Sequence, residues 1–399
     1  MSRRLHNRHI LLGVTGSIAA YKACVLLRLL QREGAEIRVA MTRAAQQFVA
    51  PLSFETLSGD GVITELFPSH RVVKTEHVHV AEWADCILVC PATSNIIGKV
   101  ASGIADDFLT TTIMASRSPV LFAPAMDYHM VKNPIYLSNC EKLERLGYRF
   151  ISSEEGELAS GAKGLGRLAD YGRIIDNVKS VLLGSDRLKG IRVLVTAGPT
   201  REFLDPVRYL TNRSSGKMGY ALAEEAALRG AEVTLVSGPT EHRSFDGVLL
   251  KNIQNAEEMK KVVLEEWRGH QVLIMTAAVA DYRPSARSNH KIKKESEKLH
   301  LRLERTEDIL AEVAALGREG VVVGFALETE EGELRATQKL MEKNLDLICL
   351  NNPLEKGAGF GEDTNKVTLI DRNKEKESLP LLPKWEVAIR ILDKVESLM

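Results

Sequence analysis

A run of small polar residues ahead of a lysine, TNRSSGKMG at 211–219, has the composition of a phosphate-binding loop. The Walker A pattern requires a glycine five positions before the glycine of Gly-Lys, and a Ser or Thr directly after the lysine. Thr211 and Met218 occupy those positions, so the pattern fails twice and a Walker A loop is excluded. A helix-forming run follows. The loop therefore either binds an anion at a helix N-terminus or only caps that helix with a serine.

This loop belongs to a repeated pattern of strand, turn, helix and strand. The pattern begins with HILLGVTGSIAAYKACVLLRLLQREGAEIRVAMT (9–42) and recurs in VLVTAGPT (193–200) and GYALAEEAALRGAEVTLVSG (219–238). Apolar β-branched strands separated by amphipathic helices predict parallel sheets covered on both faces. We therefore expect an α/β protein of two Rossmann-like domains, each a mostly parallel sheet with helices on both faces. The ligands should bind beyond the C-terminal ends of the strands.

Composition and charge limit the possible partners. The polar segment GSDRLKG (184–190) separates the halves, and we expect domains at 1–186 and 187–399. The 53 basic and 53 acidic side chains balance, which disfavours nucleic acid or a membrane surface. No apolar run is long enough to cross a bilayer. The basic first residues and the apolar run after them would allow a signal peptide, but Gly13, Gly16 and Lys22 interrupt that run, which indicates a first strand and turn. Five sparse cysteines are typical of reduced thiols in the cytoplasm, and Cys86 and Cys90 lie in a predicted buried strand without a second metal-ligand pair.

Small polar turns in the first half predict a mononucleotide pocket. Gly16 and Ser17 lie in a strand-to-helix turn, where backbone amides and a hydroxyl can receive a phosphate. The segments PATSN (91–95), GIADDFLTTTI (103–113) and APAMDYHM (123–130) add further turns, and we place all four at strand ends on one edge of the sheet. Neither GVTGSIAA nor TAGPTREFLDP has the glycine spacing of a dinucleotide fingerprint, so a nicotinamide dehydrogenase is disfavoured.

Taken together, these motifs resemble two enzyme families. The flavin-dependent cysteine decarboxylases are similar in GVTGSIAAYK, HVHVAEWAD, PATSN, GIADD and PAMD-x-x-M. Phosphopantothenate–cysteine ligase is similar in TAGPTREFLDPVRYLTNRSSGKMG, AAVADYRP, KIKK and NLDLICLNNP. The resemblance covers nearly the whole chain, in the order of the bacterial bifunctional enzymes of coenzyme A biosynthesis. It implies that a ligase half couples 4'-phosphopantothenate to cysteine with CTP and Mg2+ through an acyl-cytidylate. An FMN-binding half then decarboxylates phosphopantothenoylcysteine to 4'-phosphopantetheine.

For decarboxylation the resemblance implies roles for His77, Asp127 and Ser160. His77 matches the family histidine and is a candidate base, and a strand here would put His79 on the same face. Asp127 replaces the usual Asn. If ionised it would repel the substrate carboxylate, whereas if burial and that neighbouring charge keep it protonated it can donate a hydrogen bond. Ser160 replaces the proton-donating Cys of a glycine-rich mobile flap, GELASGAKGLGRL (156–168), and as a weaker acid could orient a water. The implied FMN contacts are Gly16, Ser17, Thr42, Thr93, Ser94, Asn95, Ala105 and Asp106.

For the ligase the resemblance makes Asn212 the residue that binds the acyl-cytidylate and Lys291 the catalytic lysine. Such chemistry needs cations on the phosphates and donors on the developing oxyanion. By themselves, HKIKKESEK (290–298) and a K-x-x-x-K helix face are more commonly solvated charge. TEDI (306–309) keeps only the end of the family's Asn-Pro-Asp-Ile, which predicts a local change at CTP. The implied CTP contacts are Ala277, Asp281, Lys291, Asp308, Ile309, Phe325, Lys339 and Lys343, with the Mg2+ ligands unassigned.

Other functions stay open on the sequence. Asp127 and Ser160 allow an active ligase joined to an impaired decarboxylase domain. A flavin-binding regulatory protein has the same first fold, but its acidic tail is missing here and the ligase motifs argue against it. An FMN-dependent prenyltransferase lacks the second half. The resemblance further implies homo-oligomers, with trimeric flavin domains, dimeric ligase domains and dodecamers that combine both.

Overall fold

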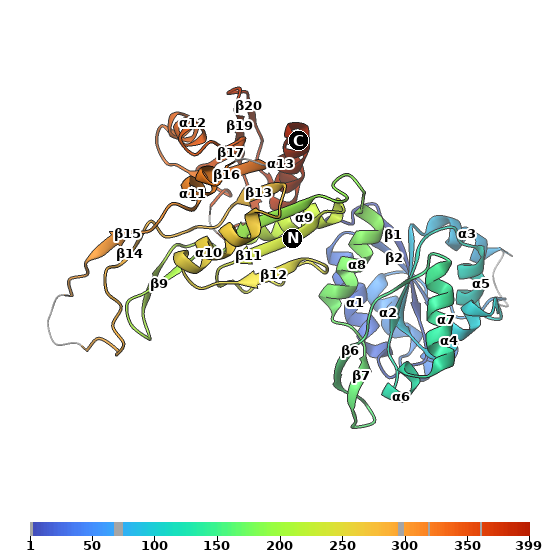
Figure 1. Cartoon of the computed structure of the whole chain (residues 1–399). Helices are drawn as coiled ribbons and strands as arrows, with labels where there is room; N and C mark the ends of the chain where they lie inside the picture. The colour runs from blue at the N-terminus through green and yellow to red at the C-terminus, as the bar shows by residue number, and fades with distance from the viewer. Residues whose placement is uncertain (1–2, 68–74, 294–298, 318–319, 360) are drawn as a thin grey trace. The chain divides into compact units, whose positions relative to one another are not determined.

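The computed structural model describes residues 3–67, 75–293, 299–317, 320–359 and 361–399. It divides into two compact units, Met1–Gly184 and Ser185–Met399, each built on its own sheet (Figure 1). The α/β class predicted from the repeated strand–helix pattern is confirmed in both units. No helix among the described residues is long and apolar enough to span a membrane.

The first unit contains a parallel sheet whose described strands are ordered β2-β1-β3-β4-β5. The chain leaves β1 toward one side and later returns to pair β3 on its other side, so a switch point lies between β1 and β3. The elements are β1 (His9–Val14), α1 (Ala20–Arg32), β2 (Glu36–Met41), η1 (Ala45–Gln47), α2 (Pro51–Ser58), α3 (Glu76–Trp83), β3 (Cys86–Ala92), α4 (Ser94–Ala101), α5 (Phe108–Ala115), β4 (Val120–Pro124), α6 (Tyr128–Val131), α7 (Pro134–Arg145), β5 (Arg149–Phe150), β6 (Glu154–Glu157), β7 (Lys163–Arg167) and α8 (Tyr171–Leu183).

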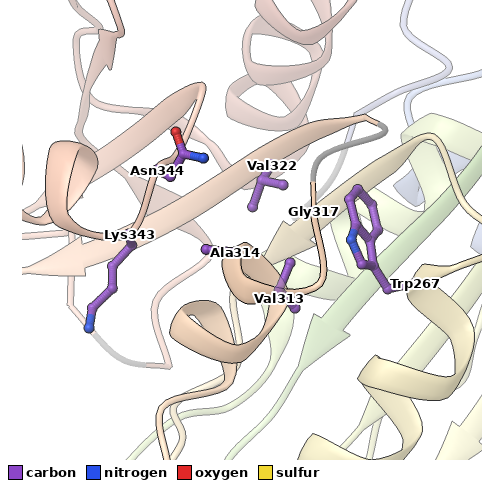
Figure 2. A pocket seen from close by; sticks show the side chains of 7 residues that line it. All are labelled: Trp267, Val313, Ala314, Gly317, Val322, Lys343 and Asn344. Atoms are coloured by element: carbon purple, nitrogen blue, oxygen red, sulfur yellow. The ribbon is translucent and has the colours of Figure 1, made fainter.

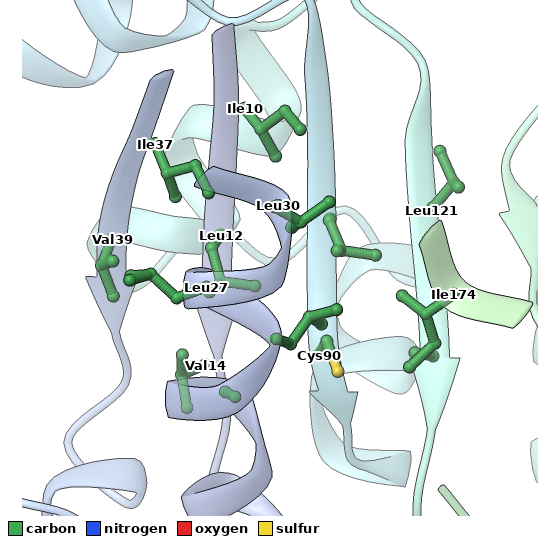
Figure 3. Close-up of a cluster of buried hydrophobic side chains, with 14 of the residues drawn as sticks. Ile10, Leu12, Val14, Leu27, Leu30, Ile37, Val39, Cys90, Leu121 and Ile174 are labelled. Carbon is green, nitrogen blue, oxygen red and sulfur yellow. The ribbon is translucent and has the colours of Figure 1, made fainter. Parts of the chain in front are cut away.

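Successive residues of β1 belong to two different cores. Ile10 and Leu12 pack against Leu27 and Leu30 of α1 (Figure 3), and Ile174 of α8 belongs to the same cluster. Leu11, between them, belongs to the cluster on the opposite face. This alternation follows from the two-residue period of a strand, and a strand buried on both faces is apolar throughout. The continuous apolar runs of the sequence therefore mark a sheet that helices cover on both sides.

The second unit has a larger sheet, with described strands ordered β12-β11-β8-β13-β16-β17-β19-β20. Its strands are parallel from β12 to β17, and β19 and β20 add on antiparallel. The switch point lies between β8 and β13. The elements are β8 (Arg192–Ala197), β9 (Arg201–Phe203), β10 (Tyr209–Thr211), α9 (Lys217–Leu228), β11 (Glu232–Ser237), β12 (Leu249–Asn252), α10 (Ala256–Trp267), β13 (Val272–Met275), β14 (Tyr282–Pro284), β15 (Leu303–Arg305), α11 (Ile309–Ala315), β16 (Val321–Leu327), α12 (Gly332–Glu342), β17 (Leu347–Asn351), β18 (Thr364–Asn365), β19 (Val367–Asp371), β20 (Lys376–Ser378), β21 (Leu382–Pro383) and α13 (Lys384–Leu398).

Two short hairpins extend from the body of this second unit. One pairs β9 with β10, and the other pairs β14 with β15 and forms an arm that projects from the sheet (Figure 1). The two hairpins are joined where the Ser288 N–H donates to the Leu204 carbonyl oxygen at 2.9 Å. Lys291 lies on the described part of the segment between β14 and β15. The candidate lysine is therefore carried by the arm.

The start of α9 differs from one of the two interpretations of the opening loop. The helix begins at Lys217, and Gly216 is its N-cap with φ of 82° and no side-chain cap hydrogen bond. Serine rarely adopts this left-handed conformation, whereas glycine does so without strain. The alternative in which a serine caps the helix is therefore wrong. Ser214 instead accepts a hydrogen bond from the Gly216 N–H at 3.3 Å.

Candidate active sites

Three turns of the first unit converge at the switch point between β1 and β3. The Thr15 hydroxyl donates to the Pro91 carbonyl oxygen at 2.7 Å and accepts from the Thr93 N–H at 3.1 Å. The Ser17 hydroxyl donates to the carbonyl oxygen of Ala125, after β4, at 3.3 Å. Residues separated by more than 70 positions are thus linked at one sheet edge, where an α/β fold binds its ligand.

The residues at this edge suit a flavin phosphate. Thr93 caps α4 by accepting from the Ile96 N–H at 3.4 Å, and Ser94 and Asn95 form the first turn of that helix. A side chain at position 16 would place its Cβ 2.5 Å from that of Ala44, so only glycine lets the 15–17 turn lie against the 42–45 turn. Small residues, hydroxyls and a helix N-terminus together form a cradle for an anionic group. Gly16, Ser17, Thr42 and the 93–95 turn are therefore brought together.

The expectation that GIADD follows a strand is wrong. Ala105 and Asp106 lie in the connection between α4 and α5, because the chain goes from one helix directly to the next. Asp106 pairs with Lys99 at 2.7 Å, and this hydrogen bond holds the pKa of the carboxyl below its usual range. The carbonyl oxygen of Ala105 accepts from the Thr111 hydroxyl at 3.2 Å. Three strand ends, not four, carry the small polar turns.

The predicted strand around His77 is also wrong. The segment is the helix α3, in which residues two positions apart point about 200° away from one another. His77 and His79 therefore do not share a face. His77 is half-buried, whereas His79 is exposed and lies 3.4 Å from the Thr75 hydroxyl. The Val-His alternation resembles a strand, but only Val80 and Ala81 of the helix are buried, as on a helix that packs through one short stripe.

The flap is a hairpin of β6 and β7, and Ser160 lies in its turn. The Ser160 hydroxyl donates to Asp127 Oδ2 at 3.0 Å, and the Met126 N–H donates to the Gly166 carbonyl oxygen at 3.0 Å. The two residues that depart from the family pattern are therefore in direct contact. They come from segments 33 positions apart in the sequence.

Two hydrogen bonds to Asp127 favour the charged form of its carboxylate. Its Oδ1 accepts from the His129 N–H at 3.0 Å, and this bond, with the one from Ser160, holds the pKa of Asp127 below its usual range. Hydrogen bonds to a carboxylate stabilise its charged form. These hydrogen bonds oppose the rise in pKa that burial causes, so a protonated Asp127 would also require the neighbouring negative charge of the substrate carboxylate.

In the second unit, a cleft of about 1050 Å³ opens at the switch point between β8 and β13. It is lined by the opening loop, by the turn after β13 and by the ends of β16 and β17. The cleft brings together seven of the predicted ligase residues: Asn212, Ala277, Asp281, Asp308, Ile309, Phe325 and Lys339. Lys291 and Lys343 are not among its described lining residues.

Asn212 follows β10 and is held by two carbonyl groups. Its amide nitrogen donates to the carbonyl oxygens of Ala278 and Val279, both at 3.1 Å. The preceding residue is held too, since the Thr211 hydroxyl donates to the Thr200 carbonyl oxygen at 2.7 Å. With both amide hydrogens engaged, Asn212 offers a ligand its Oδ1, which is a hydrogen-bond acceptor.

Lys339 of α12 and Lys343 at the C-cap of that helix interact with different groups. Lys339 is partly buried and donates to the Phe325 carbonyl oxygen at 2.9 Å, and burial lowers the pKa of its ammonium. Lys343 pairs with Asp308 at 2.7 Å. Burial alone would raise the pKa of Asp308, but the hydrogen bond from Lys343 and that from the Ala311 N–H lower it.

A second recess in this unit is too small for a substrate. It measures about 10 Å³, roughly the room for a single water, and lies among Trp267, Val313, Val322 and their neighbours (Figure 2). Lys343 is at its edge, with its side chain extending away from Trp267 (Figure 2). The large cleft is therefore the candidate ligase site.

Of the three lysines in the described lining of the cleft, Lys217 and Lys384 were not among the predicted site residues. Lys217 donates to the Gly361 carbonyl oxygen at 2.5 Å and pairs with Asp363 at 2.6 Å. Lys384, the first residue of α13, donates to the carbonyl oxygens of Glu362 and Thr364. Burial and the nearby Lys217 lower the pKa of Lys384 to about 8. Lys217 stood in the loop that was first singled out, but no motif marks Lys384, which is 167 positions further along the chain.

Within the described ranges, no group of three or more His, Cys, Asp or Glu side chains is arranged to hold a metal ion. Cys86 and Cys90 lie in the buried strand β3, as predicted, and burial raises the pKa of both thiols to about 12. Both are therefore neutral and act as small core residues.

The comparisons with known proteins match both halves of the chain. Residues 1–183 match the family described as Flavoprotein, and residues 188–399 match the DNA/pantothenate metabolism flavoprotein C-terminal domain. The coenzyme A biosynthesis bifunctional protein CoaBC of Bacillus subtilis (strain 168) is 45% identical over 397 residues, which are 99% of this chain and 98% of that protein. This chain belongs to the CoaBC family.

A further sequence relative and a solved structure are also similar to parts of the chain. A cysteine/cysteine sulfinic acid decarboxylase from an unknown prokaryotic organism is 41% identical over 88% of this chain and 99% of its own length. Among solved structures, the C-terminal domain of a coenzyme A biosynthesis bifunctional protein CoaBC is 44% identical, covers 54% of this chain and 98% of its own, and has a TM-score of 0.47.

Proposed function

We propose that this CoaBC-family protein catalyses two consecutive reactions of coenzyme A biosynthesis in the cytoplasm. The second unit couples 4'-phosphopantothenate to cysteine with CTP and Mg2+. The first unit holds FMN and decarboxylates phosphopantothenoylcysteine to 4'-phosphopantetheine. The observation that carries the proposal is the cleft of about 1050 Å³, which gathers Asn212, Asp281, Asp308, Phe325 and Lys339 in a chain related to CoaBC over its full length.

In the ligase reaction, a carboxylate oxygen of 4'-phosphopantothenate attacks the α-phosphorus of CTP and displaces pyrophosphate. The amine of cysteine then attacks the acyl carbon, and CMP leaves with the bonding electrons. Lys339 and Lys384 supply positive charge inside the cleft, where a partly desolvated cation stabilises a developing negative charge most strongly. Phe325 contributes an apolar ring to the same lining, suited to the cytosine base. Mg2+ would bind together with the triphosphate of CTP, and no protein ligand is assigned to it.

Asn212 and Lys291 are the proposed catalytic residues of this half. The free Oδ1 of Asn212 can accept a hydrogen bond from the attacking amine of cysteine, because the amide hydrogens are engaged with Ala278 and Val279. Lys291 adds a positive charge for the acyl phosphate from the arm. Lys343 acts through Asp308, whose carboxylate it pairs, rather than from the described lining of the cleft.

For the decarboxylase, the turns at Gly16, Ser17, Thr42 and Thr93–Asn95 would hold FMN, which supplies the electron acceptor and donor that the reaction requires. Ala105 and Asp106 are proposed contacts from the α4–α5 connection. His77 is the proposed base. Asp127 and Ser160 form a hydrogen-bonded pair between the flap and the edge of the sheet. A substrate carboxylate beside Asp127 adds a like charge, which favours uptake of a proton by Asp127 and its delivery through Ser160.

A second candidate function is an active ligase joined to a silent flavin domain. The hydrogen bonds that lower the pKa of Asp127 favour it, since a negative charge next to a substrate carboxylate is repulsive unless a proton is taken up. The two functions predict different products from one mixture.

With either function, we also propose that the protein is a homo-oligomer with trimeric flavin domains and dimeric ligase domains. Light scattering of the purified protein tests this oligomeric state.

The test is to incubate the purified protein with 4'-phosphopantothenate, cysteine, CTP and Mg2+ and to identify the products by mass spectrometry. Formation of 4'-phosphopantetheine and carbon dioxide supports both reactions. Accumulation of phosphopantothenoylcysteine supports the silent flavin domain, and supplying that compound directly confirms that the second step is missing. If a folded protein forms neither product, the ligase assignment is wrong.

A further inference from the structure

The arm that carries Lys291 must be held for that lysine to act. Lys291 is exposed and lies outside the described lining of the cleft, between β14 and β15. Among the residues that the structure describes, its side chain has no hydrogen bond or ion pair, so the position of its ammonium depends on what fixes the neighbouring backbone. The next residue, Ile292, is held at both of its backbone polar groups.

These two contacts come from the turn between β9 and β10. The Ile292 N–H donates to Asp205 Oδ2 at 3.2 Å, and Arg208 Nη2 donates to the Ile292 carbonyl oxygen at 3.2 Å. The other carboxylate oxygen, Asp205 Oδ1, accepts from the N–H groups of Val207 and Arg208, both at 2.8 Å. The two oxygens of Asp205 thus have different tasks. Oδ1 closes the turn, whereas Oδ2 accepts from the arm and lies 3.8 Å from Nη1 of Arg208, whose Nη2 holds the same residue of the arm.

The same hairpin leads directly into the cleft. Its second strand, β10, ends at Thr211, and the following residue, Asn212, donates to the carbonyl groups after β13. One short hairpin therefore contacts the Lys291 segment at its turn and carries Asn212 at its end. The positions of the two proposed catalytic residues are linked through about seven residues of chain, from Asp205 to Asn212.

We propose that Asp205 is a positioning residue of the ligase, which fixes Lys291 relative to Asn212 by holding the backbone of Ile292. The inference rests on the proposed ligase function. Asp205 is fully buried, and a buried carboxylate is retained only where its oxygens are hydrogen-bonded. A turn cap alone requires one oxygen, which Ser or Asn also provides. The second oxygen, directed at Ile292, explains why the residue is an acid.

The substitution Asp205→Asn separates the two tasks. Asparagine keeps one oxygen to accept from Val207 and Arg208, but places an NH2 donor against the Ile292 N–H. The reverse orientation would lose two turn bonds to keep one. Asp371→Asn is the matched control. Asp371 is also buried, its Oδ1 accepts from the N–H groups of Asn373 and Glu375, and its Oδ2 pairs with Lys394 at 2.7 Å. It is the last residue of β19 and is not among the described lining residues of the cleft.

Two readouts are measured on the full chain: steady-state pyrophosphate release with CTP, Mg2+, 4'-phosphopantothenate and cysteine, and amide hydrogen exchange of the 286–293 segment. Asp205→Asn should lower kcat about 10- to 100-fold with little change in the KM for CTP, because a catalytic group displaced by about 1 Å loses rate while the nucleotide contacts remain. Exchange at Ile292 should accelerate. Asp371→Asn should leave kcat and this exchange unchanged even if it lowers Tm. In a Lys291→Gln background, Asp205→Asn should cause no further loss.

The outcomes separate this inference from the function on which it rests. If the wild type releases no pyrophosphate, or if Lys291→Gln is as active as the wild type, the proposed function of the arm fails and the positioning role fails with it. If Lys291→Gln is impaired while Asp205→Asn has the kcat of the wild type, the positioning role alone is wrong. Equal losses in kcat for Asp205→Asn and Asp371→Asn would also overturn it, because they would show a loss of fold stability only.

Discussion

A methyl group added to one flap glycine should uncouple the two activities. Gly166 lies in β7 with φ of 140°, and a Cβ at this position would be 2.2 Å from the carbonyl oxygen of Met126. Real Cβ atoms keep at least 3.0 Å from such an oxygen, so Gly166→Ala must move the flap or the Met126 carbonyl by about 1 Å. Met126 directly precedes Asp127, whose contact with Ser160 is already 3.0 Å long. The same displacement would break that hydrogen bond.

The magnitude follows from geometry. A displacement of about 1 Å between catalytic groups typically costs about 100-fold in rate. Gly161 offers a control in the same hairpin: its φ is 78°, and nothing lies within 4 Å of an added Cβ. Gly161→Ala therefore has the strain of a positive φ, about 1–2 kcal/mol, without the overlap. The two variants share backbone strain and differ in contact with Met126.

The assay is carbon dioxide release from phosphopantothenoylcysteine, with pyrophosphate release by the same polypeptide as an internal control. Gly166→Ala should lose about 100-fold in decarboxylation and keep its ligase rate, and flavin absorbance should show that FMN is still bound. Gly161→Ala should keep most of both activities. Equal decarboxylation by the two variants would refute the argument that the register of the flap on Met126 and Asp127 controls this step.

Two predictions concern the cations of the ligase cleft. Lys339→Met should raise the KM for CTP roughly 10- to 100-fold, because it would remove the proposed charge-assisted contact to a phosphate of CTP, worth about 1.5–3 kcal/mol. The methionine leaves an apolar stem of similar length in the lining of the cleft. An unchanged KM would contradict the proposed place of Lys339 in the CTP site. The pKa of Lys384 is about 8, below the usual value of a lysine, so its ammonium is charged below that pH and neutral above it. The kcat/KM for CTP should therefore fall as the pH rises above about 8, and in Lys384→Arg, which stays charged, the fall should disappear. A fall of the same size in both proteins would assign the titration to another group.

Local patterns were sufficient for the regular parts of the fold. The apolar runs around Leu11 and Val195 predicted strands because a buried parallel strand is apolar on both faces, and both are buried strands. Where a pattern is short, the local signal is ambiguous. The two histidines of α3 alternate with valines as in a strand, yet the segment is helical. Only Val80 and Ala81 are buried, so the apolar pattern is too short to show the period of a helix in the sequence.

The serine interpretation of the α9 N-terminus failed for a different reason. Side-chain preferences favour Ser at an N-cap, but here the chain enters the helix through a left-handed residue, and Gly216 alone can adopt that conformation easily. A turn of this kind depends on what the loop packs against. An added Cβ at Gly216 would be 2.8 Å from Thr240, a residue of a separate turn.

The sequence by itself determined the two repeated strand–helix units, the glycines and hydroxyls at their turns, and the family to which the motifs point, because each of these depends on residues close together in the chain. Only the tertiary structure decided that Ser160 contacts Asp127, that Lys384 enters the cleft, and that Asp205 holds Ile292. These pairs are 33 or more positions apart or join separate elements. Their contacts depend on how sheets and hairpins pack. The hydrophobic period of a single segment predicts its secondary structure but not which distant residues it contacts.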